Sequence, residues 1–490
     1  MPGAFHVEHF GCRAARADGE AVSDRLRAAG LGEGNPAAAD VVVVNTCSVT
    51  AEADRAARAF IRRAHRLNPA ARIVVTGCYA QRAPEELAGL AGVAAVVGNS
   101  HKALTPGIAL QLAWDGTGVG PVAPELVSLQ SLLVGRSQGS APIWADDRFA
   151  HSFIEEIQLV PGVQTRPNLK IQEGCGNRCT FCVIPQTRGS SRSLPAESVL
   201  KQVEGFVAAG GNELVLSGIN LGRWGRDLAG SLAVGEEASS RWSLAGLARR
   251  ILERTRLPRL RLSSIEPMDW NEELIGLMAE FGGKQLARHA HLPLQSGSDA
   301  VLRRMHRRYR PWHYAEKVNA LVRAAGPELT LGADVMLGFP GETDAEFEET
   351  LALVRALPFG YLHLFPFSPR PGTRGWALHA ERPVPSAVVE ERMAALRALA
   401  AEKSWTHRRR FVGRELDAIT LHTTAELAAR GRTAALTENF LPLELEGGLA
   451  ANRLVRVQVT GLTAEGTLEA AVVPNPPQTA HSAEPSQCYT

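Results

Sequence analysis

Three cysteines within eight residues are the part of this sequence that most directly indicates chemistry. Cys175, Cys179 and Cys182 form a C-x3-C-x2-C pattern, and the whole chain of 490 residues has only seven cysteines. Iron–sulfur clusters are held by cysteine thiolates, usually four of them. A loop that offers three thiolates therefore predicts a [4Fe–4S] cluster in which one iron stays open to a small molecule.

Three other interpretations remain for these thiols. A structural zinc site usually takes four ligands in two pairs, and no second pair of cysteines follows at short range. A disulfide with a spare thiol needs an oxidising compartment, whereas residues 1–5 lack the basic start and apolar run of a secretory signal. The third is a set of unrelated buried cysteines. The spacing favours the cluster, and we expect a cytoplasmic location, because such clusters need a reducing environment.

Cys12, Cys47 and Cys78 are far apart in the sequence but share a setting. Each follows an apolar run and precedes a helical pattern, and the run before Cys47 contains four consecutive valines, as in a strand covered on both faces. The resulting β-α-β-α-β order implies a parallel sheet, whose strands end at one common edge. Residues 1–113 are therefore predicted to form a Rossmann- or flavodoxin-like domain in which these thiols converge on a second cluster. The alternative is that they are small core residues.

Residues 166–402 alternate strand-like and helix-like patterns, and they are predicted to form a partial (β/α)6 barrel of the TIM type. Catalytic groups of such barrels lie at the carboxyl ends of the strands. The cysteine loop follows the first strand, so it belongs at that end. The predicted strands are 169–172, 213–217, 259–263, 289–294, 329–337 and 361–367.

The loop from Cys175 to Cys182 resembles the signature of the radical S-adenosylmethionine (SAM) superfamily, in which the amino and carboxylate groups of SAM occupy the open iron. The stretches around the other three cysteines resemble the amino-terminal domain of the methylthiotransferases: Gly11-Cys12, Asn45-Thr-Cys47-Ser-Val-Thr and Thr76-Gly-Cys78-Tyr-Ala-Gln81. Leu292-Pro-Leu-Gln-Ser-Gly297 is similar to the same family, and the likeness covers residues 5–400. Residues 45–55, 75–81, 359–361 and 365–373 are similar to the branch that acts on N6-threonylcarbamoyladenosine in tRNA.

This resemblance implies SAM and two [4Fe–4S] clusters as cofactors. Cys175, Cys179 and Cys182 would hold the cluster that cleaves SAM, and Cys12, Cys47 and Cys78 would hold a sulfur-handling one. The implied reaction is radical insertion of a methylthio group at C2 of the modified adenosine beside the anticodon, with SAM as radical source and methyl donor. The partners would be the anticodon loop of tRNA and an electron donor such as flavodoxin or ferredoxin.

Other functions stay open beside this one. Within the family, isopentenyladenosine in tRNA and an aspartate of a ribosomal protein are alternative substrates. Outside it, an iron–sulfur electron carrier without a substrate and a zinc-dependent RNA-binding module are alternative classes. A carrier needs only a small shell around its cluster, so the long predicted barrel favours an enzyme.

Several short motifs at strand ends are candidate SAM contacts. The superfamily has a Gly-Gly-Glu stretch whose backbone contacts the SAM amino group, and Gly210 and Gly211 resemble it. Glu266 could bond the SAM ribose, and Arg307 could pair with a carboxylate through its planar guanidinium. For each motif the alternative is an ordinary turn, and for the basic run 303–310 it is a solvated face. The candidates are Gly210, Gly211, Ser217, Glu266, Gln295 and Arg307.

The remaining segments complete a predicted α/β organisation. Residues 114–165 lack a steady period and are expected to be a linker, and 474–490 have the composition of a disordered tail. Four short alternating runs within 403–473, which begin at residues 411, 432, 441 and 454, predict a β-barrel, in the place that the family gives to its RNA-binding TRAM barrel.

Charge and hydropathy limit the possible partners. The net charge is only +2, so nucleic-acid binding must use local patches, for which Arg430, Arg432 and Arg456 of the predicted barrel are candidates. The sequence contains no uncharged apolar run of about 18 residues, so we expect no membrane span. We also expect a monomer.

Overall fold

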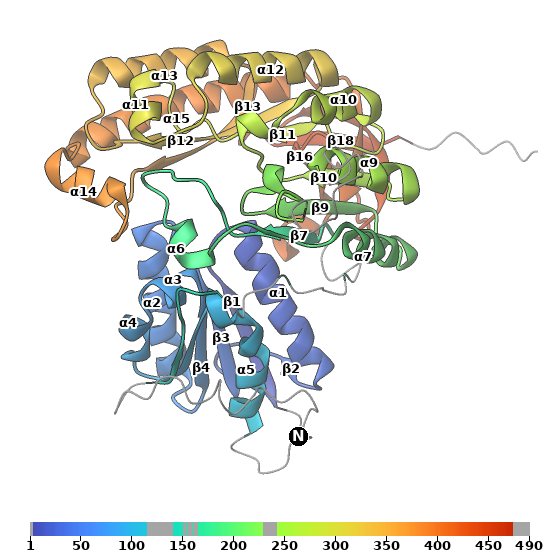
Figure 1. Cartoon of the computed structure of the whole chain (residues 1–490). Coiled ribbons are helices and arrows are strands. Elements are labelled where there is room, and N and C mark those ends of the chain that lie inside the picture. Colours follow the sequence, from blue (N-terminus) through green and yellow to red (C-terminus); the bar gives the residue numbers. More distant parts are fainter. Residues whose placement is uncertain are drawn as a thin grey trace, which may run out of the picture.

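The computed structural model describes residues 3–114, 141–149, 154, 159, 165–228 and 243–473. Figure 1 shows an amino-terminal α/β unit, a larger α/β unit above it and a small carboxyl-terminal barrel packed against the second. The predicted tail at 474–490 and most of the predicted linker at 114–165 lie outside the described residues. Within the described part, no helix is both long enough and apolar enough to cross a membrane.

The amino-terminal unit is built on a sheet of order β2-β1-β3-β4-β5-β6, in which every neighbouring pair is parallel. Strand β3 is buried along its whole length, as its valines predict. Helices α1 and α5 cover one face of the sheet, and α2, α3 and α4 cover the other. The predicted parallel-sheet fold is therefore confirmed. Its strands are β1 (Ala4–His9), β2 (Gly32–Glu33), β3 (Val41–Thr46), β4 (Arg72–Gly77), β5 (Val93–Gly98) and β6 (Ile143–Trp144), and its helices are α1 (Arg13–Ala28), α2 (Ala51–Leu67), α3 (Cys78–Arg82), α4 (Pro84–Ala88), η1 (Asn99–Leu104) and α5 (Thr105–Trp114).

The second unit is a partial barrel whose six parallel strands follow one another in chain order. Two ladders, β7-β9-β10 and β11-β12-β13, are joined by a parallel bridge between Leu260 and Leu286, and β8 pairs antiparallel with the free edge of β7. The strands are β7 (Asn168–Glu173), β8 (Arg192–Ser193), β9 (Glu213–Gly218), β10 (Arg259–Leu262), β11 (His289–His291), β12 (Thr330–Leu337) and β13 (Phe359–Pro366). All six predicted strands are present, which confirms the barrel.

Helices on the outside of this barrel bury an apolar stripe against the sheet, and together they form the largest core of the chain. They are α7 (Ala196–Ala208), α9 (Leu244–Arg254), α10 (Glu272–Phe281), α11 (Asp299–Arg304), α12 (Pro311–Ala325), α13 (Asp344–Ala356), α14 (Arg374–Glu381) and α15 (Ser386–Arg409), with the short turns η2 (Leu221–Arg223) and η4 (Pro267–Asp269). The short helix α6 (Ile184–Arg188) instead packs against α3 and η1 of the amino-terminal unit. Helix α15 runs past residue 403, where the carboxyl-terminal domain is predicted to begin.

The carboxyl-terminal unit is a closed barrel of order β14-β15-β16-β18-β17. Its core consists of alternate inward-facing residues, such as Leu443 and Leu445. The strands are β14 (Glu415–Thr420), β15 (Arg432–Thr437), β16 (Pro442–Glu446), β17 (Leu454–Leu462) and β18 (Leu468–Val472), with the short helix α16 (Ala425–Ala429) between β14 and β15. The alternating pattern predicts four of these strands and misses β18.

This small barrel closes the second unit at the amino ends of its strands. Phe440, in the turn between β15 and β16, lies with its ring centroid 4.3 Å from that of His289. The buried Arg261 of β10 donates to the carbonyl oxygen of Glu438 at 3.0 Å, and the Glu438 carboxylate pairs with Arg288 at 2.7 Å. The opposite ends of the strands stay free for the site described next.

Candidate active site

A cavity of about 360 Å³ opens at the carboxyl ends of the barrel strands. Its wall includes all three cysteines of the loop that follows β7, and its volume lies in the range of about 300–1,000 Å³ that is typical of small-molecule sites. Val49 and Thr50, which closely follow Cys47 in the amino-terminal unit, line the same cavity. The cavity therefore joins the neighbourhoods of both groups of cysteines.

Nitrogen donors surround the thiols of the cysteine loop. The Asn220 amide donates to Cys175 Sγ at 3.5 Å, the Asn177 backbone N–H donates to the same sulfur at 3.4 Å, and Arg307 Nη1 donates to Cys179 Sγ at 3.1 Å. Burial raises the pKa of the Cys182 thiol to about 12, so the metal-free thiol keeps its proton. A metal would replace that proton, and the donors would stabilise the anionic sulfur. The donor set thus fits an iron–sulfur cluster.

Two predicted SAM contacts, Glu266 and Arg307, meet beside this loop. Glu266 follows β10, Arg307 follows α11, and their carboxylate and guanidinium are 2.5 Å apart. Both line the cavity. Because Arg307 also reaches Cys179, one buried cation connects the cysteine loop to a carboxylate that can accept hydrogen bonds from a ligand.

Gln295 and Asn220 offer acceptors that nothing in the described part of the chain satisfies. Gln295 Oε1 and Asn220 Oδ1 are buried without a hydrogen-bond partner among the described residues, and both side chains line the cavity. Gln295 also has a φ of 64°, which is uncommon for a residue other than glycine. Unpaired buried acceptors and a backbone outlier in one cavity point to ligand contacts there.

The structure keeps three predicted SAM contacts away from the cavity wall. Gly210 and Gly211 precede β9 and lie at its amino end, where the carbonyl of Gly210 accepts a bond of 3.1 Å from Asn452 of the small barrel. The six residues of β9 span about 20 Å, so these glycines are too far away to contact a ligand in the cavity. Ser217 lies further along β9 but is buried, with its hydroxyl directed at the carbonyl of Leu169.

Cys12, Cys47 and Cys78 come together at one edge of the amino-terminal sheet, as predicted. They follow the adjacent strands β1, β3 and β4. Burial, and then the neighbouring thiols of Cys78 and Cys12, raise the pKa of Cys47 to about 12. Gly11 has a φ of +119°, and a side chain there would overlap Cys47. This glycine therefore permits the close approach of the two chain segments that carry the first two thiols.

A buried arginine of the barrel unit reaches this second group of cysteines. Arg188 ends α6, six residues after Cys182, and its Nε donates to Cys78 Sγ at 3.2 Å. Asn99 of the amino-terminal unit donates to the same sulfur at 3.4 Å and to the carbonyl of Thr187 at 2.8 Å. Each group of cysteines is thus contacted by the side chains of one buried arginine and one buried asparagine.

Arg188 belongs to a group of five charges between the two units, four of them buried and Asp18 partly exposed, which we call the seam: Asp18, Lys102, Lys170, Glu173 and Arg188. Arg188 pairs with Asp18 at 3.0 Å and with Glu173 at 2.5 Å, and both lysines also pair with these two carboxylates. Although burial opposes it, the cations hold the pKa of Glu173 well below its usual value. Burial lowers the pKa of Lys102, whereas Cys78, Glu173 and Asp18 outweigh burial and raise the pKa of Arg188, so the lasting positive charge beside the thiols is that of Arg188.

The seam was not predicted from the sequence, although the sequence contains a signal for it. All six residues of β7 are buried, yet two of them, Lys170 and Glu173, are charged. A buried charge requires a partner, so a charged pair in a core strand could have prompted a search for further charges. The partners on the other unit, Asp18 and Lys102, are brought close only by the folded chain.

Comparisons with known proteins agree with this geometry. Residues 169–354 match the radical SAM superfamily, and residues 4–98 match the uncharacterized protein family UPF0004. The threonylcarbamoyladenosine tRNA methylthiotransferase MtaB of Aquifex aeolicus is 33% identical over 422 residues, which cover 86% of this chain and 91% of that protein. The Bacillus subtilis protein of the same name is 33% identical over 448 residues, 91% of this chain and 90% of that one.

A relative that is named for a different substrate is similar to the same extent. The tRNA-2-methylthio-N(6)-dimethylallyladenosine synthase of Parafrankia sp. is 33% identical over 488 residues, 95% of this chain and 90% of that protein. The chain therefore belongs to the radical SAM methylthiotransferase family. Membership implies an enzyme that uses SAM and a [4Fe–4S] cluster.

Proposed function

We propose that this enzyme methylthiolates tRNA at C2 of N6-threonylcarbamoyladenosine beside the anticodon. The observation that carries the proposal is the single cavity that is lined by Cys175, Cys179 and Cys182 and, from the other unit, by Val49 and Thr50 next to Cys47. A reaction that needs both radical formation and sulfur delivery requires two metal sites that face one substrate. The names of the Aquifex and Bacillus relatives support the modified adenosine as that substrate.

The two groups of cysteines would hold two clusters with different roles. Cys175, Cys179 and Cys182 would hold the cluster that binds SAM, and Cys12, Cys47 and Cys78 would hold a second [4Fe–4S] cluster. When bound, SAM and the first cluster supply a radical able to remove an aromatic hydrogen that acid–base chemistry removes poorly.

Four side chains of the cavity would position SAM. Glu266 would accept hydrogen bonds from the SAM ribose, and Arg307 would pair with the SAM carboxylate. Gln295 and Asn220 would use their unpaired oxygens to accept from the amino groups of SAM or of the target base. Flavodoxin or ferredoxin would supply the electron.

For tRNA, the carboxyl-terminal barrel offers arginines that are already paired at its surface. Arg432 pairs with Glu469 at 3.2 Å, and Arg456 pairs with Asp417 at 3.0 Å. Surface ion pairs of this kind contribute only about 0–1 kcal/mol, so phosphates can displace the carboxylates at small cost.

The substrate is tested by mass spectrometry of tRNA nucleosides from a strain that lacks the gene. We expect the methylthio-threonylcarbamoyl nucleoside to disappear and to return with the wild-type gene. If that nucleoside persists while the methylthio derivative of isopentenyladenosine disappears, the substrate assignment is wrong. If both persist and a ribosomal protein loses a methylthio group, the tRNA proposal itself is wrong.

The two metal sites are tested separately on purified protein. Anaerobically reconstituted enzyme should contain about eight irons per chain, as two cubanes require. Cys179→Ala should abolish SAM cleavage, whereas Cys47→Ala should cleave SAM without inserting sulfur. Equal loss of cleavage in both folded variants would contradict the division of roles.

A further inference from the structure

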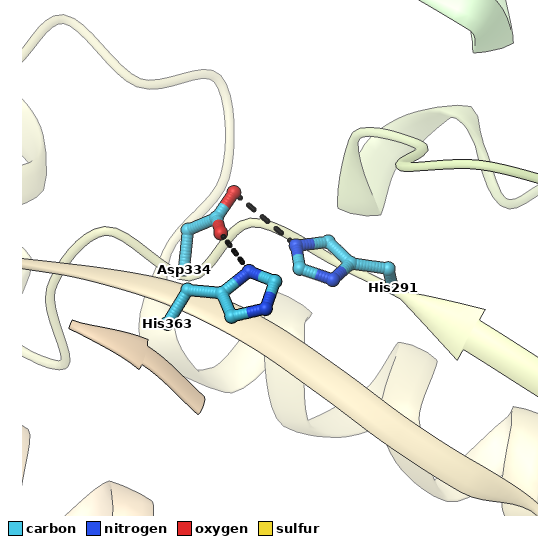
Figure 2. A group of neighbouring side chains, drawn as sticks. All are labelled: His291, Asp334 and His363. Carbon is cyan, nitrogen blue, oxygen red and sulfur yellow. Dashed lines mark hydrogen bonds and ion pairs between the residues drawn. The ribbon is translucent and has the colours of Figure 1, made fainter. Parts of the chain in front are cut away.

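Two histidines and an aspartate converge inside the barrel, on three neighbouring strands. They are His291 of β11, Asp334 of β12 and His363 of β13, and Figure 2 shows their side chains pointing toward one another. His291 Nε2 lies 3.2 Å from one Asp334 oxygen, and His363 Nδ1 lies 3.2 Å from the other. All three possible ligand atoms lie within 4.8 Å of one another.

The two N···O distances of 3.2 Å, which end on different oxygens of Asp334, are close to the distances between ligands that share one metal ion. With metal–ligand bonds of about 2.0–2.2 Å, neighbouring ligands of a tetrahedral ion lie roughly 3.3 Å apart. Two imidazoles and one carboxylate form a common ligand set for Zn²⁺ and Fe²⁺, and it leaves coordination positions open. Asp334 lines the active-site cavity, so an open position would face that cavity.

A second layer of hydrogen bonds supports the same use. The other ring nitrogen of His291, Nδ1, lies 3.1 Å from the Tyr361 hydroxyl, which lies 2.8 Å from His289 Nε2. Metal-bound histidines usually donate their second N–H to such a partner. A hydroxyl can donate or accept, so the His291 proton can move to Nδ1 when Nε2 binds a cation.

The accessibility of the three groups differs in a way that suits ion binding. The side chain of His291 is 9% exposed, that of Asp334 is 26% exposed and that of His363 is 62% exposed. The buried His291 is thus held in place by its hydrogen bond to Tyr361, whereas the exposed His363 lies where an ion can reach it from solvent. Hydrogen bonds and charge from the two histidines, acting against burial, hold the pKa of Asp334 below its ordinary value, so the carboxylate is ionised at neutral pH.

We propose that His291, Asp334 and His363 bind one divalent transition-metal cation of the Zn²⁺ or Fe²⁺ class, separate from the six cysteines. The cation replaces the two N–H···O bonds with three coordinate bonds and presents its open position to the cavity. The site does not depend on which nucleoside the enzyme modifies. The competing account is a hydrogen-bonded network in which Asp334 simply accepts from two imidazoles.

Zinc binding to the cluster-loaded enzyme separates the two accounts. Anaerobically reconstituted protein is dialysed against a series of Zn²⁺ concentrations, and zinc and iron are counted in the same samples. We expect the wild type to take up about one zinc per chain with its iron unchanged. His363→Ala and Asp334→Asn should raise the zinc Kd by at least about tenfold, and the matched control His313→Ala, on helix α12, should bind zinc like the wild type.

Each other outcome counts against the metal site. If the wild type takes up no more zinc than Asp334→Asn, the three groups form only a hydrogen-bonded network. If zinc rises only as iron falls, and does so equally in His363→Ala, the zinc occupies cysteine sites and the proposal is wrong. Because His363 is largely exposed, its removal leaves the core intact, and a retained iron count confirms the fold of each variant. A low iron count in the wild type would instead contradict the proposed function.

Discussion

Arg188 provides the sharpest test of how the two units cooperate. It is fully buried, and its guanidinium contacts Cys78 of the amino-terminal unit while it pairs with Asp18 and Glu173 of the seam. Arg188→Gln removes the charge but keeps a polar, although shorter, side chain. The variant therefore asks whether this cation stabilises the sulfurs of a cluster held by the second group of cysteines.

The size of the effect follows from Coulomb's law. An electron added to the cluster would be attracted by the guanidinium, and at roughly 5 Å and an effective dielectric constant of about 20 the attraction is about 3 kcal/mol. For a one-electron couple this corresponds to about 130 mV. Loss of the cation also leaves the carboxylates of Asp18 and Glu173 less compensated, which acts in the same direction. The midpoint potential should therefore become more negative.

The measurement is a redox titration followed by electron paramagnetic resonance. It is made in a background in which Cys175, Cys179 and Cys182 are alanine, so that only the amino-terminal cluster contributes. Arg261→Gln is the matched control, because Arg261 is equally buried and pairs with Glu213 at 2.8 Å, but contacts none of the cysteines.

Three results would refute the reasoning. A shift below about 30 mV, far less than Coulomb's law gives at this range, would mean that Arg188 does not act on the cluster electrostatically. An equal shift in Arg261→Gln would mean that any loss of a buried arginine has this effect. If the protein without Cys175, Cys179 and Cys182 binds no iron, Cys12, Cys47 and Cys78 do not hold a cluster.

Three further predictions concern single side chains. Glu266→Gln removes an anionic acceptor beside the cavity and should weaken SAM binding by about 1.5–3 kcal/mol, measured by calorimetry; unchanged affinity would exclude a SAM contact. Burial, and then nearby arginines, lower the pKa of His407 to about 4, and its ring bonds the Thr330 hydroxyl at 2.9 Å. The imidazole binds a proton near pH 6.5 in the unfolded chain but not in the folded one, so the free energy of unfolding should fall by about 3 kcal/mol between pH 6.5 and 4. In denaturation measurements at a series of pH values, His407→Gln should remove most of this fall. If the variant shows the same fall as the wild type, His407 is not responsible for it. Gly77 has a φ of +99°, and a side chain there would overlap the Thr46 carbonyl oxygen. Gly77→Ala should therefore displace the start of α3, which carries Cys78, and halve the iron content of reconstituted protein. An unchanged iron content would show that the turn accommodates the side chain.

Much of the architecture could be predicted because it depends on local patterns. Four valines in β3 define a strand that only a doubly covered sheet can bury, and the barrel strands alternate with amphipathic helices. The convergence of Cys12, Cys47 and Cys78 follows from topology alone, because parallel strands end at one edge. These features need no knowledge of contacts between distant residues.

The features that the sequence did not predict depend on strand ends and long-range contacts, which local patterns do not specify. Gly210 and Gly211 fit a short motif, but their place at the amino end of β9 depends on where the strand begins, which a motif does not specify. The contacts of Arg188 with Asp18 and Cys78 cross the boundary between two units. Helix α15 continues to Arg409, past residue 403, where the sequence pattern places the start of the carboxyl-terminal domain.

The short span from Cys182 to Arg188 has a consequence for how this enzyme can be divided. The amino-terminal sheet carries three thiols, but the cation beside Cys78 is Arg188, which belongs to the neighbouring unit. A fragment that ends before α6 would expose that sulfur and leave the carboxylates of Asp18 and Glu173 without the guanidinium that pairs with them. A chimaera that joins this sheet to the barrel of another protein would therefore have to keep α6 as well. The two units are not independent modules.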